Sequence, residues 1–205
     1  MRIIWAGCSL TYGDELKNRE EERFSHLVSD QLGAEEVNLS RNGNSNDIIL
    51  NWFIRECNRQ KPDVAVIQWS QISRFQLWNK NKDEWENLNI IGPSGKGWPR
   101  TTFYKVYTDE IGIEIFYKNV YLAEQYCKSM DIPLFMLMHK PFISIKSDYQ
   151  SPYKQLITKM PHPIWDGILP GWDVADEFKC PNGHPNELGH RKIAEYIINN
   201  FDYFQ

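Results

Sequence analysis

The sequence predicts an α/β protein with a three-layer α/β/α architecture and a mainly parallel sheet. Apolar runs of strand length alternate along the chain with longer segments whose apolar residues recur at helical spacing. Two of the runs, 63–70 and 132–139, are almost continuously apolar, which is typical of parallel strands buried on both faces. Such a sheet needs helices on both faces, and three layers follow.

Each element is predicted from its own pattern of apolar and turn residues. Helix 20–32 has apolar residues at helical spacing and ends before Gly33, and Ser45 or Asn46 can cap the helix that follows the loop at 42–45. The expected elements are, in order, a strand at 2–6, a helix at 20–32, a strand at 35–40, a helix at 46–58, a strand at 63–70, a helix at 111–129, a strand at 132–139, a short helix near 150–159 and a helix at 186–200.

Residues 76–110 do not fit this alternation, because they are polar, aromatic and rich in glycine. A structureless stretch of this length in a compact domain is either functional or mobile. We therefore expect a single domain over residues 1–205, with residues 76–110 as an insertion on the rim of the fold.

The bulk composition excludes several classes of protein. The chain has 205 residues, 41% apolar and 24% charged, with a net charge of −4, which argues against a nucleic-acid partner. No apolar run is long enough to span a bilayer, and the start has no signal-peptide pattern. The four cysteines are scattered, which favours free thiols in a reducing compartment. We expect a cytoplasmic protein without a membrane partner; the oligomeric state stays open.

A metal or cofactor site is not expected either. Cys180, His184 and His190 have a faint metal-ligand spacing, but closed zinc sites need four ligands and no second pair lies nearby. His190, inside the last predicted helix, is better explained as a structural residue.

Chemistry-bearing residues follow several of the predicted strands. Ser9 comes directly after the first strand, Gly43 after the second, Ser70 and Gln71 after the third, and His184 precedes the last helix. Because ligands bind at the carboxyl ends of parallel strands, these residues are expected at one edge of the sheet. A serine, a histidine and backbone donors are what acyl transfer requires.

Three segments of the chain resemble the conserved blocks of the SGNH/GDSL hydrolases. "GCSLTYG" (7–13) resembles the first block, with Cys8 in place of its aspartate, "NLSRNGNSN" (38–46) the second, and "GHPNELGHRKIAEYI" (183–197) the last. The resemblance implies a flavodoxin-like SGNH hydrolase fold and ester hydrolysis without a cofactor. It also implies Ser9 as nucleophile, His184 as base, and the backbone N–H groups of Ser9 and Gly43 as oxyanion donors.

The third block of the family, usually Gly-x-Asn-Asp, is not matched. The corresponding strand ends "IQWSQISR", so the asparagine that would join the oxyanion hole is absent. Ser70, Gln71 or Ser73 could supply the missing donor, and Gln71 is favoured.

The aspartate of the last block is also missing, because Pro181 occupies its position. Asp173, Asp176, Asn182 or a backbone carbonyl could orient His184 instead. Asp176 is favoured as the orienting acid.

The tryptophans of the insertion and the polar residues after the third strand suggest how a substrate is held. We expect Ser70, Arg74, Trp78 and Trp98 to contact it. Arg74 could bind a substrate carboxylate or pair with a surface acid. The aromatic, polar composition favours an O-acetyl or other short acyl ester on a carbohydrate. A second hypothesis is a binding or structural module that has kept the fold and lost the chemistry, because two family residues are missing.

Overall fold

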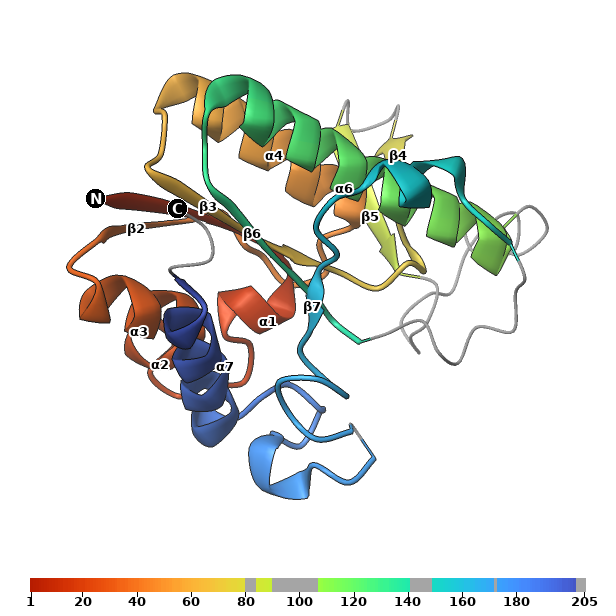
Figure 1. Cartoon of the computed structure of the whole chain (residues 1–205). Coiled ribbons are helices and arrows are strands. Elements are labelled where there is room, and N and C mark those ends of the chain that lie inside the picture. The colour runs from red at the N-terminus through yellow and green to blue at the C-terminus, as the bar shows by residue number, and fades with distance from the viewer. Residues whose placement is uncertain (80–83, 90–106, 141–148, 172, 202–205) are drawn as a thin grey trace.

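The computed structural model describes residues 1–79, 84–89, 107–140, 149–171 and 173–201. A five-stranded sheet forms the centre, with the order β2-β1-β3-β6-β7 and every neighbouring pair parallel (Figure 1). Its strands are β1 (Arg2–Ala6), β2 (Glu35–Asn38), β3 (Val64–Trp69), β6 (Leu134–Met138) and β7 (His162–Pro163). The predicted α/β fold with a parallel sheet is confirmed.

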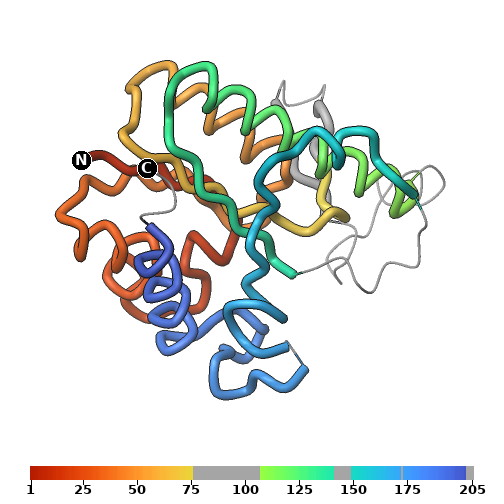
Figure 2. The backbone as a smooth tube through the Cα atoms, in the orientation of Figure 1, coloured from red at the N-terminus to blue at the C-terminus, as the bar shows by residue number. Residues whose placement is uncertain are grey.

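Helices cover both faces of the sheet. On one face α4 (Asn46–Arg59) packs against α6 (Asp109–Met130), and on the other α3 (Phe24–Gln31) packs against α7 (Glu187–Asn199) (Figures 1 and 2). Short helices complete the set: α1 (Ser9–Tyr12), α2 (Arg19–Glu22), and the 3₁₀ turns η2 (Pro152–Leu156) and η3 (Asp176–Phe178).

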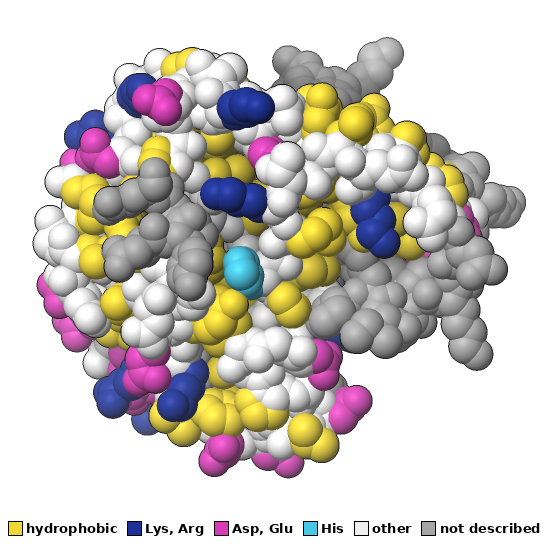
Figure 3. Space-filling view, in the orientation of Figure 1, with side chains coloured by type: hydrophobic (Ala, Val, Ile, Leu, Met, Phe, Trp, Pro, Cys, Tyr) yellow, Lys and Arg dark blue, Asp and Glu magenta, His cyan; other side chains and the backbone are white. Residues whose placement is uncertain are grey.

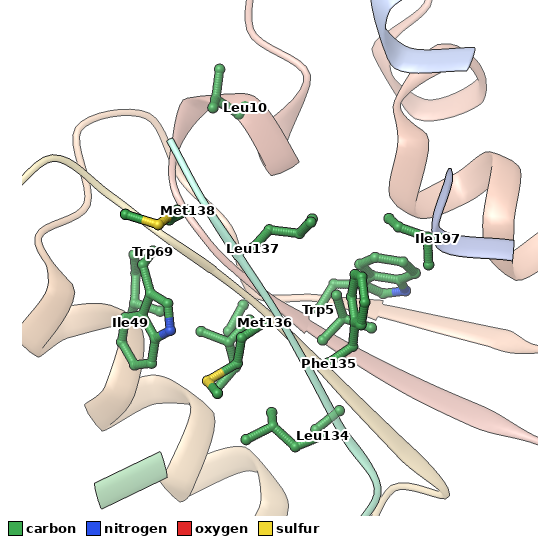
Figure 4. Packing of buried hydrophobic residues seen from close by; sticks show 14 of the residues in the cluster. Trp5, Leu10, Ile49, Trp69, Leu134, Phe135, Met136, Leu137, Met138 and Ile197 are labelled. Atoms are coloured by element: carbon green, nitrogen blue, oxygen red, sulfur yellow. The ribbon is translucent and has the colours of Figure 1, made fainter. Parts of the chain in front are cut away.

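The core lies between the sheet and these helix pairs. Because side chains alternate along a strand, β6 fills both layers: Met136 and Met138 point toward Ile49 of α4, whereas Phe135 points toward Trp5 and Ile197 (Figure 4). All five β6 residues are buried, which explains the continuous apolar run in the sequence.

Most predicted elements lie within a few residues of the observed ones, but one predicted helix is divided, and α1, β7 and a hairpin were not predicted. The expected helix at 20–32 is interrupted at Arg23, whose extended backbone (ψ 142°) separates α2 from α3. Residues 9–12, to which no helix or strand was assigned, form the single turn α1. Strand β7 was not predicted, because a two-residue strand carries no periodicity.

The expected insertion at 76–110 contains regular structure. It begins within an antiparallel hairpin of β4 (Arg74–Asn79) and β5 (Glu84–Asn89), in which Trp78 is in register with Trp85. Residues 80–83 and 90–106 lie outside the described residues, as does Trp98.

The face shown in Figure 3 carries acidic and basic side chains in both halves. Within the described ranges, no helix is both long and apolar enough to cross a membrane.

Candidate active site

The carboxyl ends of β1, β3 and β6 meet at one edge of the sheet, as parallel pairing requires. The turn from β1 into α1 begins at Gly7, where a side chain would not fit. A Cβ at Gly7 would lie 2.4 Å from the Thr11 hydroxyl and 3.1 Å from Gln68 Oε1. This close approach explains why glycine precedes the Cys8–Ser9 pair.

Gln68 on the adjacent strand β3 holds this turn in place. Its side chain is 1% exposed, and its Oε1 accepts hydrogen bonds from the Cys8 backbone N–H (3.1 Å) and the Thr11 hydroxyl (3.2 Å). Its amide group donates to the Trp69 carbonyl. A buried glutamine with satisfied polar atoms therefore fixes the backbone immediately before Ser9.

Ser9 is the first residue of α1 and is only 2% exposed. Its hydroxyl donates to Cys8 Sγ at 3.9 Å, a long contact. Within the described residues no hydrogen bond joins Ser9 to His184. Its backbone N–H has no helical acceptor, because it lies at the helix start.

The loop after β2 is fastened to both neighbouring strands. Asn44 donates to the Gly7 carbonyl at 2.9 Å, and Asn46 accepts from the Ser70 backbone N–H at 2.7 Å. Ser45 caps α4 by accepting from the Ile48 N–H, as the sequence allowed. Gly43 adopts φ +81°, a left-handed conformation, and a Cβ there would meet nothing within 4 Å. The loop thus holds Gly43 in a conformation that favours glycine.

His184 lies in the turn before α7 and is hydrogen-bonded to a carboxylate that the sequence analysis did not identify. Its Nδ1 lies 2.6 Å from Glu15 Oε2, and its Nε2 lies 3.8 Å from Asp14 Oδ2. Asp14 in turn donates its backbone N–H to the Ser9 carbonyl at 3.0 Å. The turn at 13–15 therefore joins the helix that starts at Ser9 to the ring of His184.

Glu15 is held by several donors from the turn at 182–184. Its carboxylate accepts from the backbone and side chain of Asn182, both at 2.9 Å, and from the His184 backbone N–H at 3.3 Å. Burial by itself raises the pKa of Glu15, but these hydrogen bonds and His184 outweigh it and lower the pKa. Glu15 also has φ +70°, which is unusual for a residue with a side chain.

Asp176, the acid favoured from the sequence, is not on His184 in this structure. It lies in η3, its side chain is 92% exposed, and it pairs with Lys179 at 2.8 Å. The spacing in the sequence predicted an acid shortly before His184 in the chain, whereas the carboxylate that contacts His184 comes from the turn after α1. The sequence does have two adjacent carboxylates after a glycine in "GDE" (13–15), but no pattern in it links them to His184.

Ser70 and Arg74 form a second group at the end of β3. Ser70 is 2% exposed, and its hydroxyl accepts from Arg74 Nη1 at 2.9 Å. Gln71 is partly exposed, and its carbonyl accepts from the Arg74 backbone N–H. Of Trp78, only its position on β4 is described.

Two further residues near this group have shifted pKa values. Burial raises the pKa of the Cys8 thiol, but the Arg74 guanidinium and hydrogen bonds with Leu10, Ser70 and Gln68 outweigh it, and the pKa is lowered. His139, at the end of β6, has its pKa lowered to about 3 by burial, Arg74, Lys140 and His184. His139 is therefore neutral near pH 7. It was missed in the sequence because it follows a core strand with no motif around it.

Comparison with known proteins supports the fold alone. Neither a comparison with protein-family models nor one with curated proteins gave a match. Solved structures of G-D-S-L and SGNH hydrolases share the fold over nearly the whole chain.

Three similar solved structures illustrate the range. A member of the lipolytic G-D-S-L family from Veillonella parvula is 14% identical, with a TM-score of 0.56 and 98% of each chain covered. The psychrotrophic esterase EstA from Pseudoalteromonas, in a structure inhibited by monoethylphosphonate, is 11% identical, with a TM-score of 0.57 and 98% and 97% covered. A two-domain esterase active on acetylated mannans is 15% identical, with a TM-score of 0.51; 99% of this chain and 50% of that chain are covered.

Proposed function

We propose that this chain, which has the fold of the SGNH hydrolases, is a serine esterase in which Ser9, His184 and Glu15 act together. The observation that carries the proposal is the 2.6 Å contact between His184 Nδ1 and Glu15. Glu15 lies in the turn at 13–15, in which the Asp14 backbone N–H donates to the Ser9 carbonyl. A carboxylate on Nδ1 fixes the tautomer that leaves Nε2 free to accept a proton.

In the proposed reaction, Ser9 Oγ attacks the ester carbonyl while His184 Nε2 accepts the hydroxyl proton. The same proton then passes to the departing alcohol, leaving an acyl group on Ser9. Water attacks this acyl-serine with His184 again as base, which releases the acid and restores the serine. Glu15 stabilises the imidazolium in both steps, and Asp14, 3.8 Å from Nε2, adds a second negative charge beside it.

The oxyanion is proposed to bind the backbone N–H groups of Ser9 and Gly43, with Gln71 as a further donor. The fixed loop at 43–46 supports this role, because preorganised donors stabilise a developing charge without reorganising. Ser9 must approach His184 when substrate binds. Catalytic hydrogen bonds are often long in the absence of ligand and shorten in the reactive complex.

For the substrate we propose a short acyl ester on a carbohydrate, bound in part by Trp78 and Trp98. Support comes from the aromatic, polar composition of residues 76–110 and from the similarity to an esterase active on acetylated mannans. Aromatic faces are suitable platforms for flat, partly apolar ligands.

The test measures hydrolysis of para-nitrophenyl acetate through the release of nitrophenolate, and hydrolysis of acetylated mannan oligosaccharides through the release of acetate. The Ser9→Ala variant is the control, and Asp176→Asn serves as a matched surface change. Activity of the wild type and of Asp176→Asn that is absent in Ser9→Ala supports the proposal. Equal background rates in all three variants contradict it.

The alternative is a binding module that has kept the fold without the reaction. It is favoured by the burial of Ser9, 2% exposed, and by the contact of its hydroxyl with Cys8 rather than His184. This alternative predicts binding of the acetylated oligosaccharide with no acetate release, whereas the esterase proposal predicts release.

A further inference from the structure

Arg74 carries a positive charge at the active-site edge of the sheet that no acid in the described part of the chain balances. Its Nη1 donates to the buried hydroxyl of Ser70, which is a neutral partner. Its Nε is buried and has no hydrogen-bond partner. An uncompensated charge in a partly buried place is costly, so an arrangement of this kind indicates a missing anion.

Arg23 shows how this chain pairs an arginine when the acid is its own. Arg23 Nε and Nη2 each donate to one oxygen of Glu36, both at 3.0 Å, in a two-pronged contact. In Arg74 the Nη1 group is held by Ser70, and the Nε of the equivalent edge is unpartnered. The sequence left Arg74 two possible partners, a substrate carboxylate and a surface acid. Among the described residues, no acid is paired with Arg74.

Hydrogen bonds connect Arg74, through Ser70, to the start of α4, which follows the loop of Gly43. Ser70, which accepts the hydrogen bond of Arg74, directly follows β3, and its backbone N–H donates to Asn46, the first residue of α4. The charge of Arg74 lowers the pKa of both Cys8, next to Ser9, and His139. The hydrogen bond of Arg74 to Ser70 holds the guanidinium at the carboxyl end of β3, the same edge of the sheet at which Ser9 follows β1.

We propose that Arg74 binds a carboxylate on the substrate, so that the esters this chain hydrolyses carry an anionic group near the reacting bond. A guanidinium edge matches a planar carboxylate with two parallel hydrogen bonds. Ser70 holds the other side of the guanidinium and acts as a positioning residue. The proposal rests on the esterase function proposed above and specifies its substrate class; on a carbohydrate, it implies an acidic sugar.

The test compares two acetyl esters of nearly equal shape, para-acetoxybenzoate and para-acetoxybenzamide, which differ in charge. We expect the wild type to prefer the benzoate. Arg74→Gln should lower kcat/KM for the benzoate roughly 10- to 100-fold, mainly through KM, as loss of a charge-assisted hydrogen bond predicts. It should change the benzamide rate less than about threefold. Arg55→Gln, an exposed arginine on α4, is the matched control and should leave both rates unchanged.

A binding measurement separates this proposal from the esterase proposal. In the Ser9→Ala background, para-acetoxybenzoate should bind in calorimetric titration, and adding Arg74→Gln should weaken that binding by a similar factor. If binding depends on Arg74 but the wild type shows no turnover, the esterase proposal is contradicted and the carboxylate site is kept. Turnover of the benzamide with equal losses for both esters in Arg74→Gln would overturn the carboxylate site and keep the esterase. If Arg74→Gln does not fold, Arg74→Lys replaces it, because lysine keeps the charge but not the two-pronged edge. Arg74→Lys should show an intermediate loss of kcat/KM on the benzoate only. If its loss is not selective for the benzoate, the proposal is overturned.

Discussion

Glu15 Oε2 lies 2.6 Å from Nδ1 of His184, although the two residues are 169 positions apart in the sequence. Glu15 follows the helix that Ser9 begins, so one short segment supplies both the proposed nucleophile and the proposed orienting acid. The backbone of Glu15 has a left-handed conformation, with φ +70°. Conformations of this kind cost free energy and tend to occur at functional sites.

Replacement of this carboxylate should therefore affect turnover far more than folding. We expect Glu15→Gln to lower kcat by up to about 10⁴-fold, because the amide cannot hold His184 in the same tautomer or stabilise its charge. Esterase rates and thermal melting are the measurements. Asp176→Asn, a change of the same chemistry in an exposed ion pair, should retain wild-type turnover. The reverse result, loss in Asp176→Asn and none in Glu15→Gln, would return the role to Asp176.

The lowered pKa of Glu15 predicts how stability depends on pH. Because the folded-state pKa lies below the ordinary value of 4.5, the folded protein holds the charged form more strongly than the unfolded chain does. The resulting stabilisation is complete above pH 4.5 and is lost as the pH falls through the folded-state pKa. Thermal melts across this range should show wild type losing more stability than Glu15→Gln in acid. Parallel curves for the two proteins would contradict the assignment.

Gln68 should be necessary for the geometry before Ser9. Gln68→Met removes the acceptor of the Cys8 N–H and the Thr11 hydroxyl at similar volume, and leaves both buried donors without a partner. We expect a loss of about 1–3 kcal/mol in the free energy of unfolding and a lower kcat. Urea denaturation and esterase rates test both. Gln60→Met, a change of the same type beyond the end of α4, should leave both quantities near wild type.

The order of strands and helices in the central part of the fold was predictable because it depends on the pattern of apolar residues. The run at 132–139 is buried as β6 on both faces, and Ser45 caps α4 where the sequence placed a cap. The site was predictable as far as it depends on the ends of strands: Ser9 and Ser70 follow β1 and β3 at the same edge of the sheet.

The contact of Glu15 with His184 was not predictable, because it is fixed by tertiary structure rather than by sequence spacing. Positions near His184 offered Asp173 and Asp176, whereas Glu15 reaches the histidine from the other end of the chain. The hairpin β4–β5 was missed for a different reason. In β4 the alternation of polar and apolar residues runs only from Arg74 to Leu77, and β5 has only Trp85 and Leu88 as apolar residues, so neither strand shows a pattern long enough to mark it.

Labelling with diethyl para-nitrophenyl phosphate tests most directly whether Ser9 is the nucleophile. Attack by Ser9 Oγ would form a phosphorus–oxygen bond, release para-nitrophenolate and leave a diethylphosphoryl group on the serine. We predict about one equivalent of nitrophenolate per chain and a peptide adduct at Ser9, present in Cys8→Ala and absent in Ser9→Ala. An adduct on Cys8, or no adduct in the folded wild type, would contradict the account.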